Sequence, residues 1–180
     1  MSGLYSERNK VQRTARIDTG GAPRKEKSMI KVMFICHGNI CRSPMAEFIM
    51  KDIVRKNHKE REFEIASAAT STEELGNSVY PPARRKLLEN GIRCDGKTAR
   101  QMTMQDYRYY DLLIVMDNNN MKNAKRIIGN DTDNKLHLLM DYTEQGGTVS
   151  DPWYTRDFDR AYNDILSGCQ ALFDYLTKNE

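Results

Sequence analysis

A regular alternation of short apolar runs and longer amphipathic segments, which begins at Met29, constrains the fold of this 180-residue chain more than any other feature. The apolar runs lie at residues 30–35, 63–66, 112–116 and 136–140. Each is rich in aliphatic or aromatic residues, which is typical of a buried strand. Because helical patterns separate these runs, the sequence predicts an α/β fold in which helices cover both faces of a parallel sheet.

The helical segments carry apolar residues at intervals of three and four positions, and prolines and glycines mark several of their ends. The helices are expected to start at Pro44, to run from Pro81 to Gly91, to cover residues 121–128, and to start again near Asp157. Ser43 is expected to cap the first helix, because a serine at that position accepts a hydrogen bond from a free amide group. Leu87 and Leu88 are expected on the buried face of the second helix.

The first 28 residues differ from the rest of the chain in charge and in pattern. They hold seven basic and three acidic residues, a net charge of +4, within a chain whose formal net charge is +3. No apolar period is sustained in this segment, so we expect a disordered or artificially added basic tail over residues 1–28. Residues 29–180 then form one domain with a net charge of −1, which argues against a nucleic-acid partner.

Several classes of protein are excluded by what the sequence lacks. No apolar stretch reaches the roughly 18 residues that suggest a membrane span. The first residues lack the apolar middle region of a secretory signal. Four cysteines in 180 residues are too few for a secreted domain held together by disulfides. The sequence therefore predicts a cytoplasmic protein without a membrane partner.

The segment from Cys36 to Pro44 joins the first predicted strand to the first predicted helix. Ligands of doubly wound sheets bind at the carboxyl ends of strands, and a helix N-terminus offers free amide groups to an anion. A cysteine and an arginine separated by five residues can close a loop whose amide groups point inward. Gly38 and Asn39 are residue types that tolerate the left-handed backbone that such a loop needs.

Phosphate chemistry follows from the residue types in this loop. Arg42 carries a planar guanidinium that matches two phosphate oxygens. Cys36 is expected to lie among amides, this guanidinium and a helix terminus, which favour the nucleophilic thiolate. The Ser43 hydroxyl is placed to donate to the same sulfur. The alternative is a buried cysteine in an ordinary strand-to-helix turn, but the whole combination favours an activated nucleophile in a phosphate cradle.

The motif Cys36-His-Gly-Asn-Ile-Cys-Arg-Ser-Pro resembles the active-site loop of the low-molecular-weight protein tyrosine phosphatases, and the likeness covers about residues 29–177. The resemblance implies a doubly wound, four-stranded parallel sheet and hydrolysis of phosphotyrosine through a cysteinyl-phosphate, without a metal or another cofactor. It implies Cys36 as nucleophile, Arg42 as phosphate ligand, Ser43 as thiolate stabiliser, and Asn39 as the holder of the left-handed turn. The residues expected to bind phosphate are His37, Gly38, Asn39, Ile40, Cys41, Arg42 and Ser43.

A general acid is needed because the phenolate of tyrosine, whose pKa is about 10, is a poor leaving group. The segment Asp151-Pro-Trp-Tyr follows the last predicted strand, and the resemblance implies that Asp151 is the acid and then the base that activates water. Trp153 and Tyr154 are expected to form walls for an aromatic ring. The alternative is a helix-capping turn whose aromatic side chains pack into the core.

Three positions depart from the best-known members of the family. Glu73 stands where an aromatic substrate wall often stands, so it is expected to line the slot as a carboxylate. Lys97 stands near the position where many relatives carry a histidine that supports the loop asparagine. His37 follows the nucleophile and is expected to point outward. Asp117 is interpreted as a helix-capping residue, and Asp131 as part of a solvated turn rather than of a metal site.

The spacing of Cys36 and Cys41 allows a reversible disulfide that would protect the nucleophile from overoxidation, which makes Cys41 a candidate redox partner. Zinc is less favoured, because no second cysteine pair completes four ligands. Cys94 and Cys169 are expected to be core or surface thiols.

The sequence leads to a phosphotyrosine phosphatase that acts on a protein or a small aryl phosphate, and leaves its oligomeric state open. One alternative is a phosphoarginine phosphatase, although Ile40 stands where the members associated with that activity carry threonine. An arsenate reductase on the same fold would need further cysteines at close spacing. A non-catalytic phosphate-binding or phosphocarrier module would need neither Arg42 nor Asp151.

Overall fold

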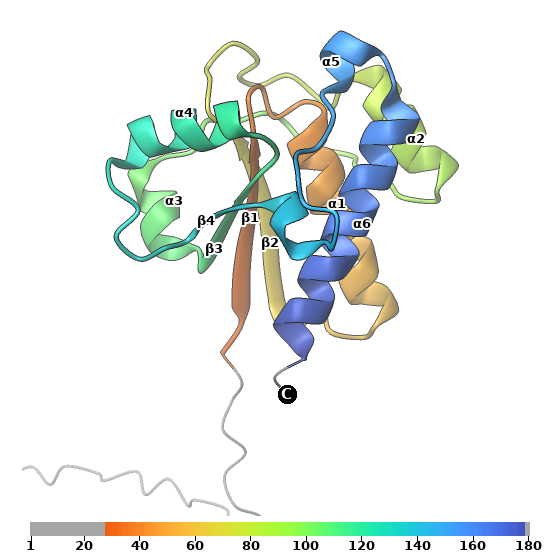
Figure 1. Ribbon diagram of the computed structural model, residues 1–180. Coiled ribbons are helices and arrows are strands. Elements are labelled where there is room, and N and C mark those ends of the chain that lie inside the picture. The colour runs from red at the N-terminus through yellow and green to blue at the C-terminus, as the bar shows by residue number, and fades with distance from the viewer. Residues whose placement is uncertain (1–27, 179–180) are drawn as a thin grey trace, which may run out of the picture.

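The computed structural model describes residues 28–178 and confirms the predicted α/β class. Four parallel strands form one sheet in the order β2-β1-β3-β4. Their bounds are β1 Ile30–Cys36, β2 Phe63–Ala69, β3 Leu112–Val115 and β4 Leu136–Leu138. Figure 1 shows α1, α2 and α6 on one side of this sheet, and α3 and α4 on the other. The predicted basic tail lies outside the described residues except for its last position.

The helices carry the remaining regular structure. Their bounds are α1 Arg42–Lys56, α2 Pro81–Glu89, α3 Met104–Tyr109, α4 Asn118–Ile128, α5 Pro152–Thr155 and α6 Phe158–Thr177, with a 3-10 turn η1 at Leu139–Tyr142. Within the described part of the chain, no helix is both long enough and apolar enough to span a membrane.

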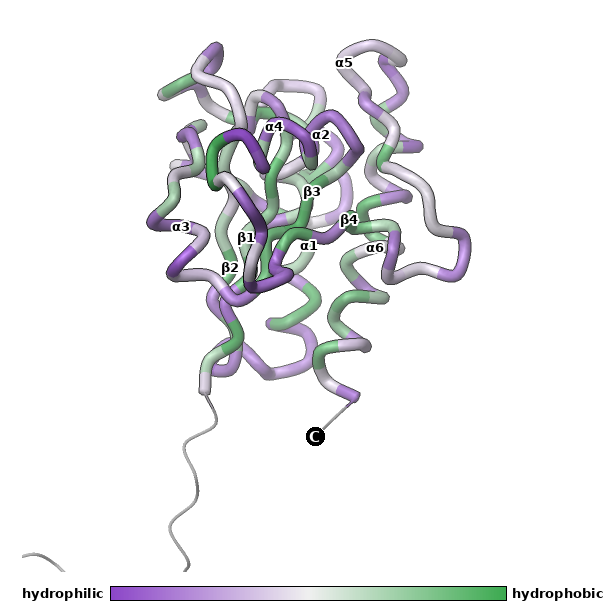
Figure 2. The backbone as a smooth tube through the Cα atoms, turned by 60° about the vertical axis from the view of Figure 1, so that its left-hand side comes forward, coloured by the Kyte–Doolittle hydropathy of each residue, from purple (hydrophilic) through white to green (hydrophobic). Residues whose placement is uncertain are grey.

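The pleat of β1 divides the hydrophobic core into two layers. Val32 and Phe34 are fully buried and pack with residues of α1 and α6, whereas Met33 and Ile35 are fully buried toward α3 and α4. Alternate residues of a strand point to opposite faces, so an unbroken apolar run is what a strand covered on both sides requires. Figure 2 shows this hydrophobic colouring concentrated in the strands, with hydrophilic segments around them.

Several predicted boundaries were wrong by a few residues. The helix predicted from Pro44 begins at Arg42, so Ser43 lies inside it and is not its cap; the N-cap position is Cys41, which makes no side-chain capping bond. The fourth strand ends at Leu138, because residues 139–142 turn into a 3-10 helix. Leu88 is 48% exposed, since α2 is short and buries only Ala83 and Leu87.

Two helices were missed because they are too short to show an apolar period. The α3 helix is started by a capping box, in which Thr103 and Asp106 each bond to the other's backbone amide. The α5 helix has four residues and is capped by Asp151. Asp117 caps α4 by accepting from the backbone amide of Asn120, which confirms its predicted role.

Candidate active site

The loop between β1 and α1 contains one residue with a left-handed backbone, Asn39, at a φ of 58°. This confirms the conformation expected of Asn39. Gly38 does not share it, and the expectation that it would was wrong. A Cβ atom at Gly38 would lie 3.2 Å from Cγ of Glu74, so glycine is favoured there by the close approach of a neighbouring loop.

Cys36 lies at the base of this loop, and the residue is only 4% exposed. The backbone amide of Asn39 donates to Sγ at 3.3 Å, and the Ser43 hydroxyl lies 3.0 Å from it. Ser43 Oγ already accepts a hydrogen bond from Asn39 Nδ2 at 2.8 Å, so its own proton can point to the sulfur or to the more distant carbonyl oxygen of Ala68 at 3.4 Å. Two donors aimed at one sulfur stabilise negative charge on it.

A buried polar network holds Asn39 from below. Asn39 Nδ2 also donates to Ser67 Oγ at 2.9 Å, and Ser67 in turn donates to the carboxylate of Glu47. Lys97 lies 3.1 Å from that carboxylate and donates to the carbonyl oxygen of Ser67 at 3.0 Å. Glu47 is 5% exposed, so its charge is compensated inside the protein. The carboxylate therefore orients a chain of hydrogen bonds that ends at the nucleophile.

Arg42 is 3% exposed and is held by two aspartates that come from opposite sides of the loop. Its guanidinium donates to Asp117 at 2.7 Å, to Asp151 at 3.1 Å, and to the carbonyl oxygen of Val149 at 3.2 Å. The ion pair with Asp117 was missed, because 75 residues separate the partners and no local pattern links them.

Asp151 combines both readings that the sequence left open. One carboxylate oxygen accepts from the backbone amide of Trp153 at 3.1 Å and caps α5, while the other faces Arg42. Trp153 is 43% exposed and Tyr154 is 82% exposed, so the alternative in which these aromatic side chains pack into the core is wrong. The ring of Trp153 contacts Tyr80, with centroids 5.3 Å apart.

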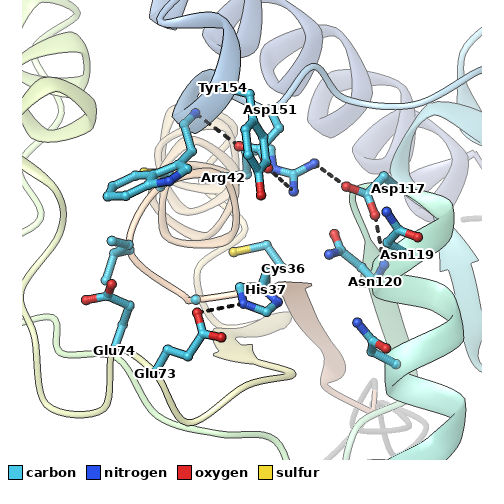
Figure 3. A pocket seen from close by; sticks show the side chains of 15 residues that line it. Cys36, His37, Arg42, Glu73, Glu74, Asp117, Asn119, Asn120, Asp151 and Tyr154 are labelled. Atoms are coloured by element: carbon cyan, nitrogen blue, oxygen red, sulfur yellow. Dashed lines mark hydrogen bonds and ion pairs between the residues drawn. The ribbon is translucent and has the colours of Figure 1, made fainter.

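These groups surround a cavity of about 250 Å³ (Figure 3). The predicted site residues that line it are Cys36, His37, Gly38, Ile40, Cys41, Arg42, Glu73, Asp151, Trp153 and Tyr154. Asn39, in the loop, and Ser43, in the first turn of α1, are not part of the lining. Sequence reasoning did not place five further lining residues in the site, which are Glu74, Asp117, Asn119, Asn120 and Asn123. Four of these residues, from 117 to 123, belong to α4 or to its N-cap. They lie beside the nucleophile loop because β3, which precedes α4, is the neighbour of β1 in the sheet.

The rim of the cavity carries carboxylates. Glu73 is 70% exposed at its side chain and pairs with His37 at 3.0 Å. His37 is itself half exposed, as expected of a residue that points outward. Figure 3 shows Glu73 and Glu74 together on the side of the cavity opposite Asp117. Only Arg42 among the lining residues carries a permanent positive charge.

The four cysteines are all free thiols and all buried. Burial, together with the nearby charge of Cys36, raises the pKa of Cys41 to about 12. Asp131 accepts hydrogen bonds from Tyr107 Oη and from two backbone amides, so its turn is held by ordinary protein contacts. Among residues 28–178, no group of three or more His, Cys, Asp or Glu side chains is arranged to hold a metal ion.

Comparison with known proteins gives consistent results. The family model described as low molecular weight phosphotyrosine protein phosphatase matches residues 31–180. The low molecular weight protein-tyrosine-phosphatase YfkJ of Bacillus subtilis is 35% identical over 154 residues, which are 84% of this chain and 99% of that protein. PtpA of Staphylococcus aureus is 33% identical over 84% of this chain and 96% of its own length.

Solved structures show the same likeness. The crystal structure of YfkJ has a TM-score of 0.83 and covers 86% of this chain and 99% of its own. That of SP-PTP, a low molecular weight protein tyrosine phosphatase from Streptococcus pyogenes, has a TM-score of 0.74 at 41% identity, and covers 83% of this chain and 94% of its own.

Proposed function

The chain belongs to the low molecular weight phosphotyrosine protein phosphatases, which are phosphoric monoester hydrolases, and we propose that Cys36, Arg42 and Asp151 carry its reaction. The observation that supports this assignment most strongly is their convergence. A sulfur with two hydrogen-bond donors, a guanidinium and a carboxylate line the same cavity, although Asp151 is 109 residues from Arg42.

In the first step, the Cys36 thiolate attacks phosphorus while the bond to the tyrosine oxygen breaks. Arg42 binds two phosphoryl oxygens, and the protonated Asp151 carboxyl donates its proton to the departing phenolate. The product of this step is a cysteinyl-phosphate. In the second step, Asp151 takes a proton from water, whose oxygen attacks phosphorus, and the thiolate leaves again.

Asp117 and Asn39 support this chemistry without taking part in bond changes. Asp117 is the N-cap of α4 and holds one nitrogen of the guanidinium, while the other nitrogen contacts Asp151 in the lining of the cavity. Asn39 fixes the left-handed turn of the loop and the position of Ser43. We also propose that Trp153 and Tyr154 form one wall for the substrate ring, with Glu73 and its neighbour Glu74 on another side.

Leaving-group dependence tests the role of Asp151. We expect Asp151→Asn to slow phosphoenzyme formation most for aryl phosphates with the least acidic phenols, because these need the proton most. Asp174→Asn, a change at an exposed residue of α6 outside the cavity, serves as the matched control. Equal slowing for all leaving groups would remove Asp151 from the acid role.

The nucleophile is tested by Cys36→Ser, which should abolish turnover, against Cys94→Ser as the control at a second buried thiol. Activity that survives Cys36→Ser would overturn the assignment. A side-by-side assay of phosphotyrosine, phosphoserine, phosphoarginine and arsenate separates the proposed substrate class from the two alternatives on this fold. Full activity in the presence of a chelator is expected of a metal-independent reaction.

We further propose that oxidised Cys36 is protected by Cys41. Peroxide would convert the Cys36 thiolate to a sulfenic acid, and the Cys41 thiol would then displace water to form a disulfide. A Cys41→Ser variant should lose activity irreversibly under peroxide, whereas the unmodified protein should recover with dithiothreitol. We place the working protein in the cytoplasm, where such thiols stay reduced.

A further inference from the structure

Asn120, the third residue of α4, combines deep burial with a position in the lining of the cavity. The residue is only 2% exposed. Its backbone amide donates to the Asp117 carboxylate at 2.8 Å, which fixes it beside the carboxylate that holds Arg42. Figure 3 shows its side-chain amide directed toward the space between Cys36 and Arg42.

The side-chain amide of Asn120 has no hydrogen-bond partner within the described residues. Its Oδ1 atom is fully covered and unpaired. Its Nδ2 atom is not among the fully covered atoms, and it makes no hydrogen bond to another residue of the described range 28–178. Buried side-chain amides are hydrogen-bonded in most proteins, so an amide in the cavity lining whose Nδ2 donor has no protein partner is available to a bound ligand.

The charges around the cavity decide which kind of partner fits. Arg42 is the one permanently cationic residue in the lining, and it marks where an anion is bound. A phosphoryl group carries oxygen acceptors, and the matching atom of asparagine is the Nδ2 donor. A neutral donor also suits this position, because a second cation beside Asp117 would compete with Arg42 for that carboxylate.

We propose that Asn120 is a substrate-binding residue whose Nδ2 donates a hydrogen bond to a non-bridging phosphoryl oxygen. This inference rests on the proposed phosphatase function and adds a contact from α4 to the loop that follows β1. The phosphoryl group is thereby bound by two segments, the loop after β1 and the first turn of α4. These segments lie together because β1 and β3, which precede them, are neighbours in the sheet. The contact orients the group relative to the Cys36 sulfur in both steps.

Binding of inorganic phosphate tests the proposal without turnover. Asn120→Ala should weaken phosphate binding, measured by calorimetry, and lower kcat/KM for p-nitrophenyl phosphate by roughly ten- to a hundred-fold, as expected for loss of one donor to a charged group. Asn120→Asp keeps the shape but replaces the donor by a negative charge, and should bind phosphate still more weakly. Asn118→Ala, on the same helix and outside the lining, is the matched control and should change neither quantity.

A spectroscopic measurement covers the case in which the variants are unstable. The side-chain amide resonance of Asn120 in the ¹⁵N-labelled native protein should shift on titration with inorganic phosphate. An unshifted resonance, or native-like phosphate binding by folded Asn120→Ala, would overturn the proposal. A loss of thermal stability with native-like phosphate binding would also overturn it and assign Asn120 a structural role. Phosphate binding by a native protein that lacks turnover would instead contradict the proposed function.

Discussion

The buried pair of Lys97 and Glu47 provides the sharpest test of how the active-site loop is held. Lys97→Met removes the ammonium group but keeps most of the volume of the side chain. The change deletes the 3.1 Å contact with the Glu47 carboxylate and the 3.0 Å hydrogen bond to the Ser67 carbonyl oxygen. The Glu47 carboxylate, which is charged, and the Ser67 carbonyl oxygen then remain inside the protein without the lysine.

The expected loss of stability follows from the burial of the pair. The side chains of Lys97 and Glu47 are 12% and 6% exposed, and removal of one member of a buried pair typically costs about 3–5 kcal/mol. Glu47 keeps a second partner, since Lys51 Nζ lies 2.6 Å from its other oxygen. We therefore expect a loss near the lower end, about 3 kcal/mol. Lys51→Met should cost no more than about 1 kcal/mol, because Lys51 is 44% exposed.

These two variants form a matched pair, because both lysines contact the same carboxylate. Urea unfolding gives the stabilities, and p-nitrophenyl phosphate hydrolysis gives kcat/KM. Lys97→Met should lower kcat/KM roughly tenfold, since Asn39 and Ser43 depend on Ser67 for their positions, and it should slow alkylation of Cys36 by iodoacetate. Lys97→Arg should restore part of both quantities. Equal small effects of Lys97→Met and Lys51→Met would refute the idea that the network positions the loop.

Three further outcomes are expected. Gly168→Ala should destabilise the fold by about 1–3 kcal/mol in urea unfolding, because its Cβ would lie 2.5 Å from Cγ of Leu139; an unchanged midpoint would contradict the packing of α6 against η1. Peptides with lysine or arginine beside phosphotyrosine should be hydrolysed better than peptides with acidic neighbours, because the rim of the cavity carries the Glu73 carboxylate. Glu73→Gln should reduce this preference by roughly two- to fivefold and should leave the hydrolysis of p-nitrophenyl phosphate unchanged. Deletion of residues 1–28 should leave kcat unchanged, and a folded truncation with a large loss of turnover would contradict the predicted domain boundary.

Local patterns were sufficient for the strand-loop-helix unit that carries the nucleophile. Cys36 and Arg42 are six positions apart, and the apolar run before them and the helical pattern after them place both residues in one loop. Asp151 required the family resemblance, because an Asp-Pro pair has no specific meaning by itself. The two short helices gave no periodic signal, since each contains fewer than two full turns.

Other features of the site had little or no sequence signal. The family resemblance marked Lys97 as a departure near a supporting histidine, but a lysine and a glutamate are normally exposed, and no local pattern indicates that Lys97 meets Glu47 inside the protein. The sequence also did not show why glycine is favoured at position 38, because this depends on the close approach of Glu74 from another loop.

The sequence by itself determined the α/β class, the nucleophile loop and its anion-binding chemistry, because these depend on hydrophobic period and on residues close together in the chain. Only the tertiary structure decided which side chains surround that loop. The order β2-β1-β3-β4 brings the carboxyl end of β3 beside that of β1, and with it Asp117 and Asn120. The burial of charged groups is decided in the same way, since burial of an ionised side chain is tolerated only where folding supplies its partner.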